Sequence, residues 1–296
     1  MSMARQTFER RQLGLTLRRL RERSGRSRQD AAEKISRALS RIVQLENGNG
    51  TVSASDLEKL LDFYDVTGAE RNTVDALGVE ARKRSRKSTY TDVLPGSFQR
   101  FADLEGAATH IAYYDSGLIP AILQSADYVS EEIKSGDGIW WEQPSPAERA
   151  SRETFRLDRQ ERVLNSDEPK KLDFVFTEDA LYSEPRNTYV MRDQLEHLLQ
   201  IAEKYPNVTI QVMPLGTARN PAPSGGLVLL DFNESAVPIG VASVAYGPAT
   251  YFYDGADTAT LRRAMTKIQE IAMSPEESLN LIRKKLEVYH RGPHRQ

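Results

Sequence analysis

The segment at residues 17–48, LRRLRERSGRSRQDAAEKISRALSRIVQLENG, has the most regular pattern in the chain. Apolar residues recur in it every three or four positions, which is the spacing of one face of a helix. Gly25 and the pair Asn47-Gly48 are natural helix ends, and residues 36–38 form a tight turn. The segment therefore predicts two short amphipathic helices joined by a turn, with another helix just before them.

Capping residues set the boundaries of these helices. The first is expected over residues 11–23, with leucines at helical spacing. The second opens with Ser27 and, three positions on, Asp30, an arrangement that resembles a capping box, and it runs to about Ile35.

The third helix follows the turn, and two more helices follow it. The third is expected to point four apolar residues inward, namely Leu39, Ile42, Val43 and Leu45. The fourth carries apolar residues from Leu57 to Tyr64 on one face, and the fifth covers residues 68–80.

The outward face of the third helix carries Ser40, Arg41, Gln44 and Asn47. Arginine binds guanine O6 and N7 with two hydrogen bonds, and glutamine does the same with adenine. This is the pattern of a helix-turn-helix, whose second helix enters the major groove of double-stranded DNA. Arg41 and Gln44 are the predicted base readers.

Further DNA contacts are expected around this helix. They comprise two residues at the start of the second helix, one in the turn and two on the first helix: Arg28, Gln29, Arg37, Arg18 and Arg19. Helix N-termini favour phosphate, and phosphate contacts position a protein without specifying a sequence.

The charge of the chain is unevenly distributed. Residues 1–48 hold twelve Arg or Lys against five Asp or Glu, whereas the net charge of the whole chain is −2. Residues 49–90 are neutral, so the remainder carries the negative excess. A basic head on an acidic body fits a polyanion-binding module on a solubilising domain.

Residues 13–65 resemble the Xre-type (Cro/repressor-like) helix-turn-helix. The whole chain resembles actinobacterial regulators that join this motif to a C-terminal domain of unassigned function. The resemblance rests on matches in the same order along the chain: YTDVLPGSFQRFADLEGAA (90–108), SGLIPAILQSADYV (116–129), RQERVL (159–164), YVMRDQLEHLLQIAE (189–203), NVTIQVMPLG (207–216) and MSPEESLNLIRK (273–284). It implies a regulator often encoded beside a small partner protein, in an antitoxin-like or developmental arrangement.

The chain departs from the family pattern at four positions. Arg28 stands where the family usually has glutamine, and Ser36 stands where a glycine is expected in the turn. Ala38 replaces the usual Ser or Thr cap of the third helix, which costs of order 1 kcal/mol. Ala121 replaces a glycine in the second domain.

The predicted organisation is a multi-domain chain, α and α/β. A helical DNA-binding domain at 11–80 and a basic linker at 81–90, with RKRSRK at 82–87, precede a mixed α/β domain with a small sheet at 91–296. Its expected helices cover 97–110, 126–135, 146–165, 189–204, a segment around 261–272 and one opening at Ser274. Its expected strands cover 172–178, 207–214, 226–232 and 239–246.

The second domain is expected to bind rather than catalyse. The chain has four histidines and no cysteine, and it carries no zinc, nucleophile-elbow or P-loop motif, so no catalytic residue, metal or cofactor is assigned. His110 and His197 are expected in helices. The aromatic residues Trp140, Trp141, Tyr113 and Tyr114 are the predicted ligand- or partner-binding surface.

The leading hypothesis is a transcription regulator that binds double-stranded DNA as a homodimer and senses a small-molecule effector or a small partner protein. Two alternatives stay open: an enzymatic or nucleotide-binding second domain, for which the loop Ser224-Gly225-Gly226 is the candidate cradle, and an antitoxin-like scaffold that binds protein. No secretory h-region and no membrane-length apolar run occur, so a soluble, cytoplasmic protein is expected.

Overall fold

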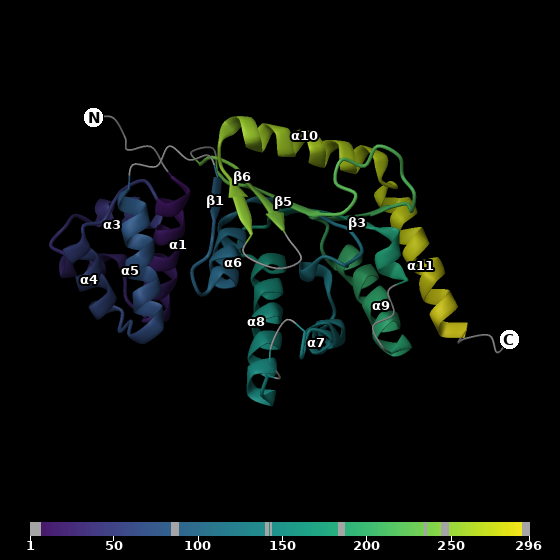
Figure 1. Cartoon of the computed structure of the whole chain (residues 1–296), viewed down its shortest axis with the longest axis horizontal. Helices are drawn as coiled ribbons and strands as arrows, with labels where there is room; N and C mark the ends of the chain where they lie inside the picture. The colour runs from purple at the N-terminus through teal and green to yellow at the C-terminus, as the bar shows by residue number, and fades with distance from the viewer. Residues whose placement is uncertain are drawn as a thin grey trace. The chain divides into compact units, whose positions relative to one another are not determined.

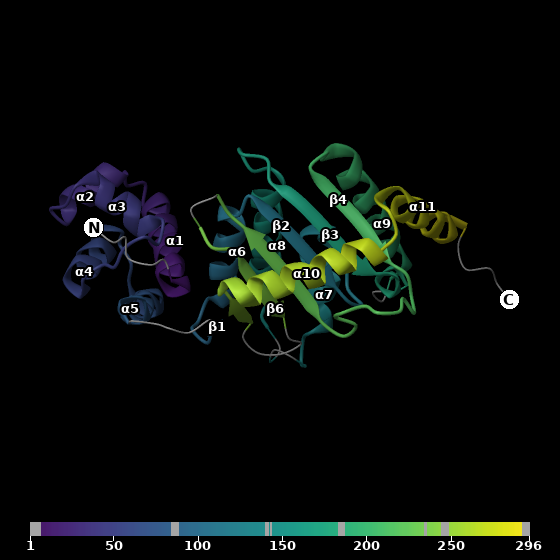
Figure 2. The same ribbon diagram turned by 90° about the horizontal axis from the view of Figure 1, so that it is seen from above.

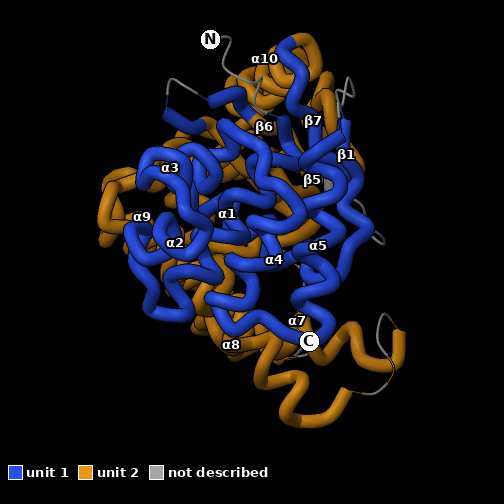
Figure 3. Tube along the Cα trace, turned by 90° about the vertical axis from the view of Figure 1, so that its left-hand side faces the viewer, with its two compact units in different colours: residues 1–107, 232–238, 248–255 blue, residues 108–231, 239–247, 256–296 orange. Residues whose placement is uncertain are grey.

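The computed structural model forms two compact units, which are described separately. Unit 1 comprises residues 1–107, 232–238 and 248–255, and unit 2 comprises the rest (Figure 3). The structure describes residues 7–83, 89–139, 142, 144–182, 187–233, 236–243 and 249–291.

Unit 1 begins with five helices, labelled in Figure 2: α1 (Phe8–Arg23), α2 (Arg28–Lys34), α3 (Leu39–Glu46), α4 (Ala54–Phe63) and α5 (Gly68–Arg82). Helix α1 starts three residues earlier than predicted, because the Thr7 side chain accepts a hydrogen bond from the Arg10 amide and caps it. The capping box of Ser27 and Asp30 is confirmed at the start of α2. Apolar side chains from all five helices form one buried core, and this helical bundle confirms the predicted fold class of the N-terminal region.

Unit 1 also contains β1 (Thr89–Thr91), β7 (Thr250–Phe252) and α6 (Ser97–Ala107). The two short strands pair antiparallel. Phe8 of α1 packs on Tyr90 and Tyr251, with ring centroids 5.0 and 4.6 Å away. The first helix therefore contributes to a second cluster, outside the five-helix core.

The predicted linker at 81–90 falls partly on regular structure. Its first two residues belong to α5 and its last two to β1, while residues 84–88 lie outside the described residues. The predicted domain bounds remain predictions.

Unit 2 is built on a mixed sheet. Its strands are β2 (His110–Asp115), β3 (Lys171–Thr177), β4 (Val208–Met213), β5 (Gly226–Asp231) and β6 (Ile239–Ser243), in the order β6-β5-β2-β3-β4. Strands β2, β3 and β4 run parallel, with Leu172 opposite both Ile111 and Val208. Strand β5 is antiparallel to both β2 and β6. The mixed α/β fold class is thereby confirmed.

Helices cover both faces of this sheet. Helix α10 (Gly255–Ile271) crosses one face, as Figure 2 shows, and its Met265 and Ile268 pack on Tyr114 and Leu229. Figure 1 shows three helices on the other face, namely α7 (Ala126–Ser135), α8 (Pro146–Leu164) and α9 (Thr188–Lys204). Helix α11 (Pro275–Arg291) and two short 3-10 helices, η1 (Ala121–Leu123) and η2 (Glu178–Leu181), complete the unit.

One predicted helix is too long. The helix expected over 97–110 ends at Ala107, and His110 begins the central strand β2. The placement of His110 in a helix is therefore wrong. Four successive residues of β2 are buried because both faces of the sheet are covered, so the strand lacks the alternation that marks a half-exposed strand. Within the described residues, no helix is long and apolar enough to cross a membrane.

Candidate nucleic-acid interface

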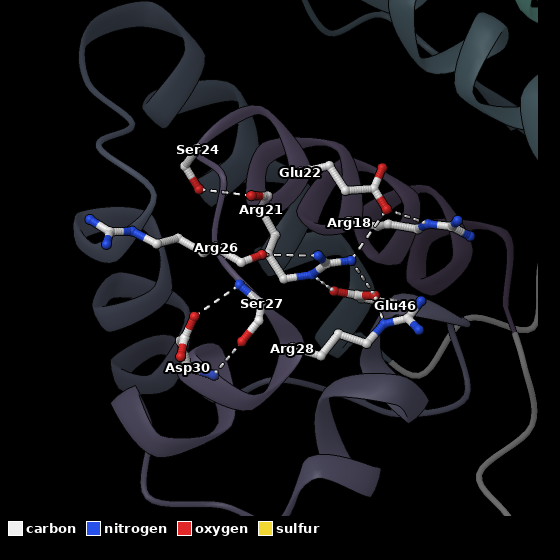
Figure 4. Close-up of polar contacts among 9 residues, drawn as sticks. All are labelled: Arg18, Arg21, Glu22, Ser24, Arg26, Ser27, Arg28, Asp30 and Glu46. Carbon is white, nitrogen blue, oxygen red and sulfur yellow. Dashed lines mark hydrogen bonds and ion pairs between the residues drawn. The ribbon is translucent and has the colours of Figure 1, made fainter.

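A buried carboxylate ties the first three helices together (Figure 4). The Glu46 side chain, at the end of α3, is 2% exposed. Arg21 of α1 donates to both of its oxygens, with Nε 2.5 Å from Oε1 and Nη2 3.2 Å from Oε2. Arg28 at the start of α2 donates through Nε to Oε2 at 2.7 Å. One residue thus fixes α2 and α3 against α1.

The environment of Arg21 favours its charged form. Burial opposes the charge, but the hydrogen bond and negative charge of Glu46 outweigh it, so the pKa of Arg21 is raised above its ordinary value. Arg21 Nη1 also donates to the carbonyl oxygen of Arg26 at 3.1 Å. The same guanidinium therefore stabilises the connection between α1 and α2.

Two glycines let α1 approach the end of α3. A Cβ atom on Gly14 would lie 2.7 Å from the carbonyl oxygen of Glu46. Gly48 has a φ of +71°, and its Cβ would lie 2.6 Å from Cα of Arg11. Only glycine fits this close contact at both positions without displacing backbone.

The turn between α2 and α3 has the two departures expected from the sequence. Ser36 adopts a φ of 56°, in the left-handed region that favours glycine. Ala38 occupies the N-cap position of α3 and makes no side-chain cap hydrogen bond. The motif folds without the glycine and without the usual cap.

Five of the predicted DNA-contacting residues are exposed on α2, the turn and α3. They are Gln29, Arg37, Ser40, Gln44 and Asn47. Gln29 donates to Glu33 of its own helix at 2.8 Å. The Arg37 side chain is 58% exposed and lies 3.6 Å from the Asp56 carboxylate. These residues form the outward face of the motif, and their contacts with DNA stay predictions.

The other four predicted contacts are arginines that already have partners within unit 1. Arg41 is half-buried and donates through Nη2 to the carbonyl oxygen of Thr51, and Arg28 is held by Glu46. Arg18 pairs with Glu22 one turn along α1, at 2.9 Å. A DNA contact by any of them competes with the existing bond.

Arg19 is the most constrained of the four. Its Nε lies 2.9 Å from Asp103, and its Nη1 lies 3.5 Å from Glu70. Its role as a phosphate contact stays a prediction. Such a contact would compete with the two carboxylates that already neutralise the Arg19 side chain.

The prediction that Leu39 points inward is wrong. Its side chain is 45% exposed at the first position of α3, while Ile42 and Leu45 are buried at 2% and 5% exposure. Val43 is half-buried. The apolar stripe of α3 packs only along its later turns, so Leu39 lies beside Ser40 on the outward face.

Sequence reasoning missed Arg21 and Glu46. A signal for both was present, because each lies four positions after a core residue of its own helix, Arg21 after Leu17 and Glu46 after Ile42, and this spacing puts it on the inward face. A charged residue is rarely buried unless it is paired, so two such positions indicate an ion pair.

Of the four aromatic residues predicted to form a ligand- or partner-binding surface, two are buried and two lie outside the described residues. Tyr113 and Tyr114 are buried in β2, at 4% and 0% exposure. Arg159 donates to the Tyr113 hydroxyl at 2.9 Å, and Asn220 donates to the Tyr114 hydroxyl at 2.6 Å. They contribute to the core of unit 2, and a ligand-binding role stays a prediction. Trp140 and Trp141 lie outside the described residues.

A histidine held by two carboxylates lies at the start of β2. His110 Nε2 is 2.8 Å from Asp173 and Nδ1 is 3.1 Å from Asp231. These hydrogen bonds raise the pKa of His110, against the effect of burial. Arg262 adds a two-point contact to Asp231. The three partners come from β3, β5 and α10, so no local sequence pattern could have joined them.

Comparison with known proteins identifies both parts of the chain. Residues 12–74, from α1 into α5, match the family model described as "Helix-turn-helix domain". Residues 98–284 match the model described as "Domain of unknown function (DUF5753)", and this match spans more than half of the chain. The chain belongs to this family and carries an N-terminal helix-turn-helix domain. No curated protein and no solved structure matches it.

Proposed function

We propose that this chain is an Xre-type, sequence-specific transcription regulator that inserts α3 into the major groove of double-stranded DNA. The observation that carries the proposal is the pairing of an exposed polar face on α3 with a buried anchor on the same helix. Ser40 and Gln44 are exposed, while Glu46 is fixed to Arg21. A helix held this rigidly presents its outward side chains in one orientation, as base reading requires.

The outward face suggests how bases are read. The Gln44 amide matches the N6 and N7 edge of adenine. The exposed Leu39 is an apolar side chain suited to a thymine methyl group. Arg37, exposed in the turn, is the proposed phosphate contact. Arg41 is left out of this set because its guanidinium is bonded to Thr51.

The second part of the proposal concerns unit 2. We infer that it mediates homodimerisation and senses an effector or a small partner protein, in an antitoxin-like arrangement, without catalysis of its own. The support is a mixed sheet covered by helices on both faces, an architecture in which ligands bind at strand ends. A two-fold dimer implies a palindromic operator with half-sites about one helical turn apart.

Selection from a random double-stranded DNA library with the full-length chain tests the first part. A palindromic consensus is the expected result. Gln44→Ala should then relax the preference at one base pair per half-site, by about 1–3 kcal/mol. Gln200→Ala, at an exposed glutamine of α9, is the matched control and should leave the consensus unchanged. Enrichment of no sequence would overturn DNA reading and favour a protein-binding scaffold.

A further inference from the structure

Helix α1 has a second packed face, which is polar. Glu9, Gln12, Thr16 and Arg19 stand at positions i, i+3, i+7 and i+10, so they share one face of the helix. This polar face is turned toward a part of unit 1 outside the five-helix bundle, formed by β1, α6, β7 and residues 232–238 and called the α6 layer below. Helix α6 packs against α1.

Three side chains of the polar face are buried with a polar atom left over. They are Glu9, Gln12 and Thr16. Among the described residues, Glu9 Oε2, Gln12 Oε1 and Thr16 Oγ1 have no hydrogen-bond partner. A polar atom buried without a partner is less stable than the same atom in water. The contact therefore leaves three acceptors on one helix in an environment that disfavours them.

The side-chain bonds that cross the contact are modest. Gln12 donates through Nε2 to Asp92, at the start of the segment that leads into α6, over 3.3 Å. Arg19 donates through Nε to Asp103 of α6 over 2.9 Å. The Arg19 side chain is 24% exposed, so water screens this ion pair in part.

Each partner keeps its most buried ion pair to itself. In the α6 layer, Arg100 donates to both carboxylate oxygens of Asp92, and the two side chains are 4% and 0% exposed. In the five-helix bundle, Arg21 is paired with Glu46. Separation of the two parts breaks neither pair, so both can stay folded when the contact between them is lost.

Arg11 adds a buried cation to the same contact. Its Nη1 donates to the carbonyl oxygen of Val237 at 3.2 Å, and its guanidinium carbon lies 3.3 Å from the ring centroid of Phe232. Burial lowers the pKa of Arg11 to about 10. Among the described residues, no carboxylate is paired with it. A buried cation with only a carbonyl and an aromatic ring as partners gains from release into water or onto an anion.

Apolar contact is concentrated at one end of α1. Phe8 packs on Tyr90 and Tyr251, with ring centroids 5.0 and 4.6 Å apart. The half-buried Leu94, between β1 and α6, packs against the core of the five-helix bundle. Phe8, at the first position of α1, is therefore the natural pivot of any movement at this contact.

We propose that the polar face of α1 is a detachable, autoinhibitory contact. The five-helix bundle separates from the α6 layer about Phe8 while both parts stay folded. Separation returns the three unpartnered acceptors to water and frees the Arg11 and Arg19 guanidinium groups. The closed form withholds these two cations from a polyanion. The detachment can be tested without DNA, and only its effect on DNA binding rests on the function proposed above.

Engineered thiols measure the detachment, because the chain has no cysteine of its own. Thr16→Cys replaces a hydroxyl that lacks a partner among the described residues, and Val74→Cys places a thiol in the five-helix core. Both full-length variants are labelled with an uncharged maleimide at several urea concentrations below the unfolding transition, and each rate is divided by that of the unfolded variant.

The thiol of Thr16→Cys should react at least about tenfold faster than that of Val74→Cys. Its rate should also depend less steeply on urea, because detachment exposes less surface than unfolding of the bundle. The urea dependence decides the matter even if Val74→Cys lowers stability. Equal urea dependence at the two sites would overturn the proposal.

Asp103→Asn tests whether this contact is the one that opens. In the Thr16→Cys background it should speed labelling about fivefold, since it removes the carboxylate that holds Arg19. Asp62→Asn, the matched control, neutralises an exposed carboxylate of α4 and should change the rate less than about twofold. An unchanged rate in Asp103→Asn, or an equal gain in the Val74→Cys background, would overturn the proposal.

The autoinhibitory role has a separate readout. A saturating concentration of the selected duplex should speed labelling of Thr16→Cys, and Asp103→Asn should bind that duplex up to about fivefold more tightly than wild type. If the duplex binds and neither quantity changes, the detachable contact stands and its autoinhibitory role is overturned. If no duplex binds, DNA reading fails, and the thiol rates still decide the contact.

Discussion

Substitution of Glu46 by glutamine is the sharpest perturbation of the helix-turn-helix. The change preserves side-chain volume, so it opens no cavity, but it leaves the Arg21 guanidinium without its carboxylate. The two side chains are 2% and 9% exposed. Removal of one partner from a buried pair costs about 3–5 kcal/mol. The glutamine oxygen still accepts one hydrogen bond, so we expect the lower end, about 3 kcal/mol.

Native-state hydrogen exchange of the full-length chain measures this cost where it arises. The slowest amides of α1 to α4 report the free energy of opening these helices. A loss of about 3 kcal/mol corresponds to roughly a hundredfold faster exchange. The amides of β2 and β3, in unit 2, serve as an internal reference and should be unchanged.

Arg28→Gln is the matched control for the same cluster. Arg28 contacts the same carboxylate but is 39% exposed, so its loss should cost about 1 kcal/mol or less. Exchange in Glu46→Gln that is less than about fivefold faster than in wild type would refute the reasoning. Equal effects of the two substitutions would refute it as well.

Three further changes have defined outcomes. Ala38→Ser supplies the missing cap of α3 and should raise the free energy of opening of α3 by about 1 kcal/mol, which slows hydrogen exchange of its amides. Faster exchange would contradict the N-cap assignment. Gly14→Ala places a methyl group against the backbone at the end of α3 and should destabilise unit 1 by about 1–3 kcal/mol, a cost that an unchanged urea midpoint would exclude. His110 has a raised pKa, so its stabilisation is complete below its ordinary value of 6.5 and is lost as the pH rises through the folded-state pKa. The difference in unfolding free energy between wild type and His110→Gln should therefore shrink with rising pH in urea titrations, and a constant difference from pH 5 to 9 would contradict it.

Local signals explain why most of the helix-turn-helix was predictable. Ser27 and Asp30 are three positions apart and form the cap of α2 as expected. The stripes of α1 and α4 fall on the buried core. Leu39 was assigned inward because a periodic stripe does not show how far the neighbouring helices extend, and at the first turn of α3 they leave it exposed.

The sequence could not predict which arginines are already bonded to other groups of unit 1. The composition gives a basic head, but it does not give the carboxylates that meet each guanidinium. Arg19 lies beside Asp103, which is 84 positions away, and Arg41 bonds to the backbone ten positions on. Such pairings are set by tertiary packing, so a list of basic residues overstates how many are free to bind phosphate.

In unit 2, too, some elements were predictable from the sequence and others were not. Four of its strands were predicted, because long apolar or alternating runs mark them. Only the first residue of the central strand β2 was assigned, to the end of a helix, and the rest of the strand was not predicted. The three-residue strands β1 and β7 were too short for any periodic signal.

The salt dependence of binding to a selected duplex tests the central claim most directly. If α3 enters the major groove with cationic side chains on the flanking phosphates, the logarithm of the association constant falls linearly with the logarithm of the salt concentration. With Arg37 of each protomer neutralising one phosphate, the slope should be about −2 or steeper. Arg37→Ala removes one phosphate contact from each protomer of the proposed dimer, so it should make the slope shallower by about two units, while Gln44→Ala should lower affinity and leave the slope unchanged. Absence of binding at low salt, or a slope near zero, would contradict the proposal that this chain reads DNA.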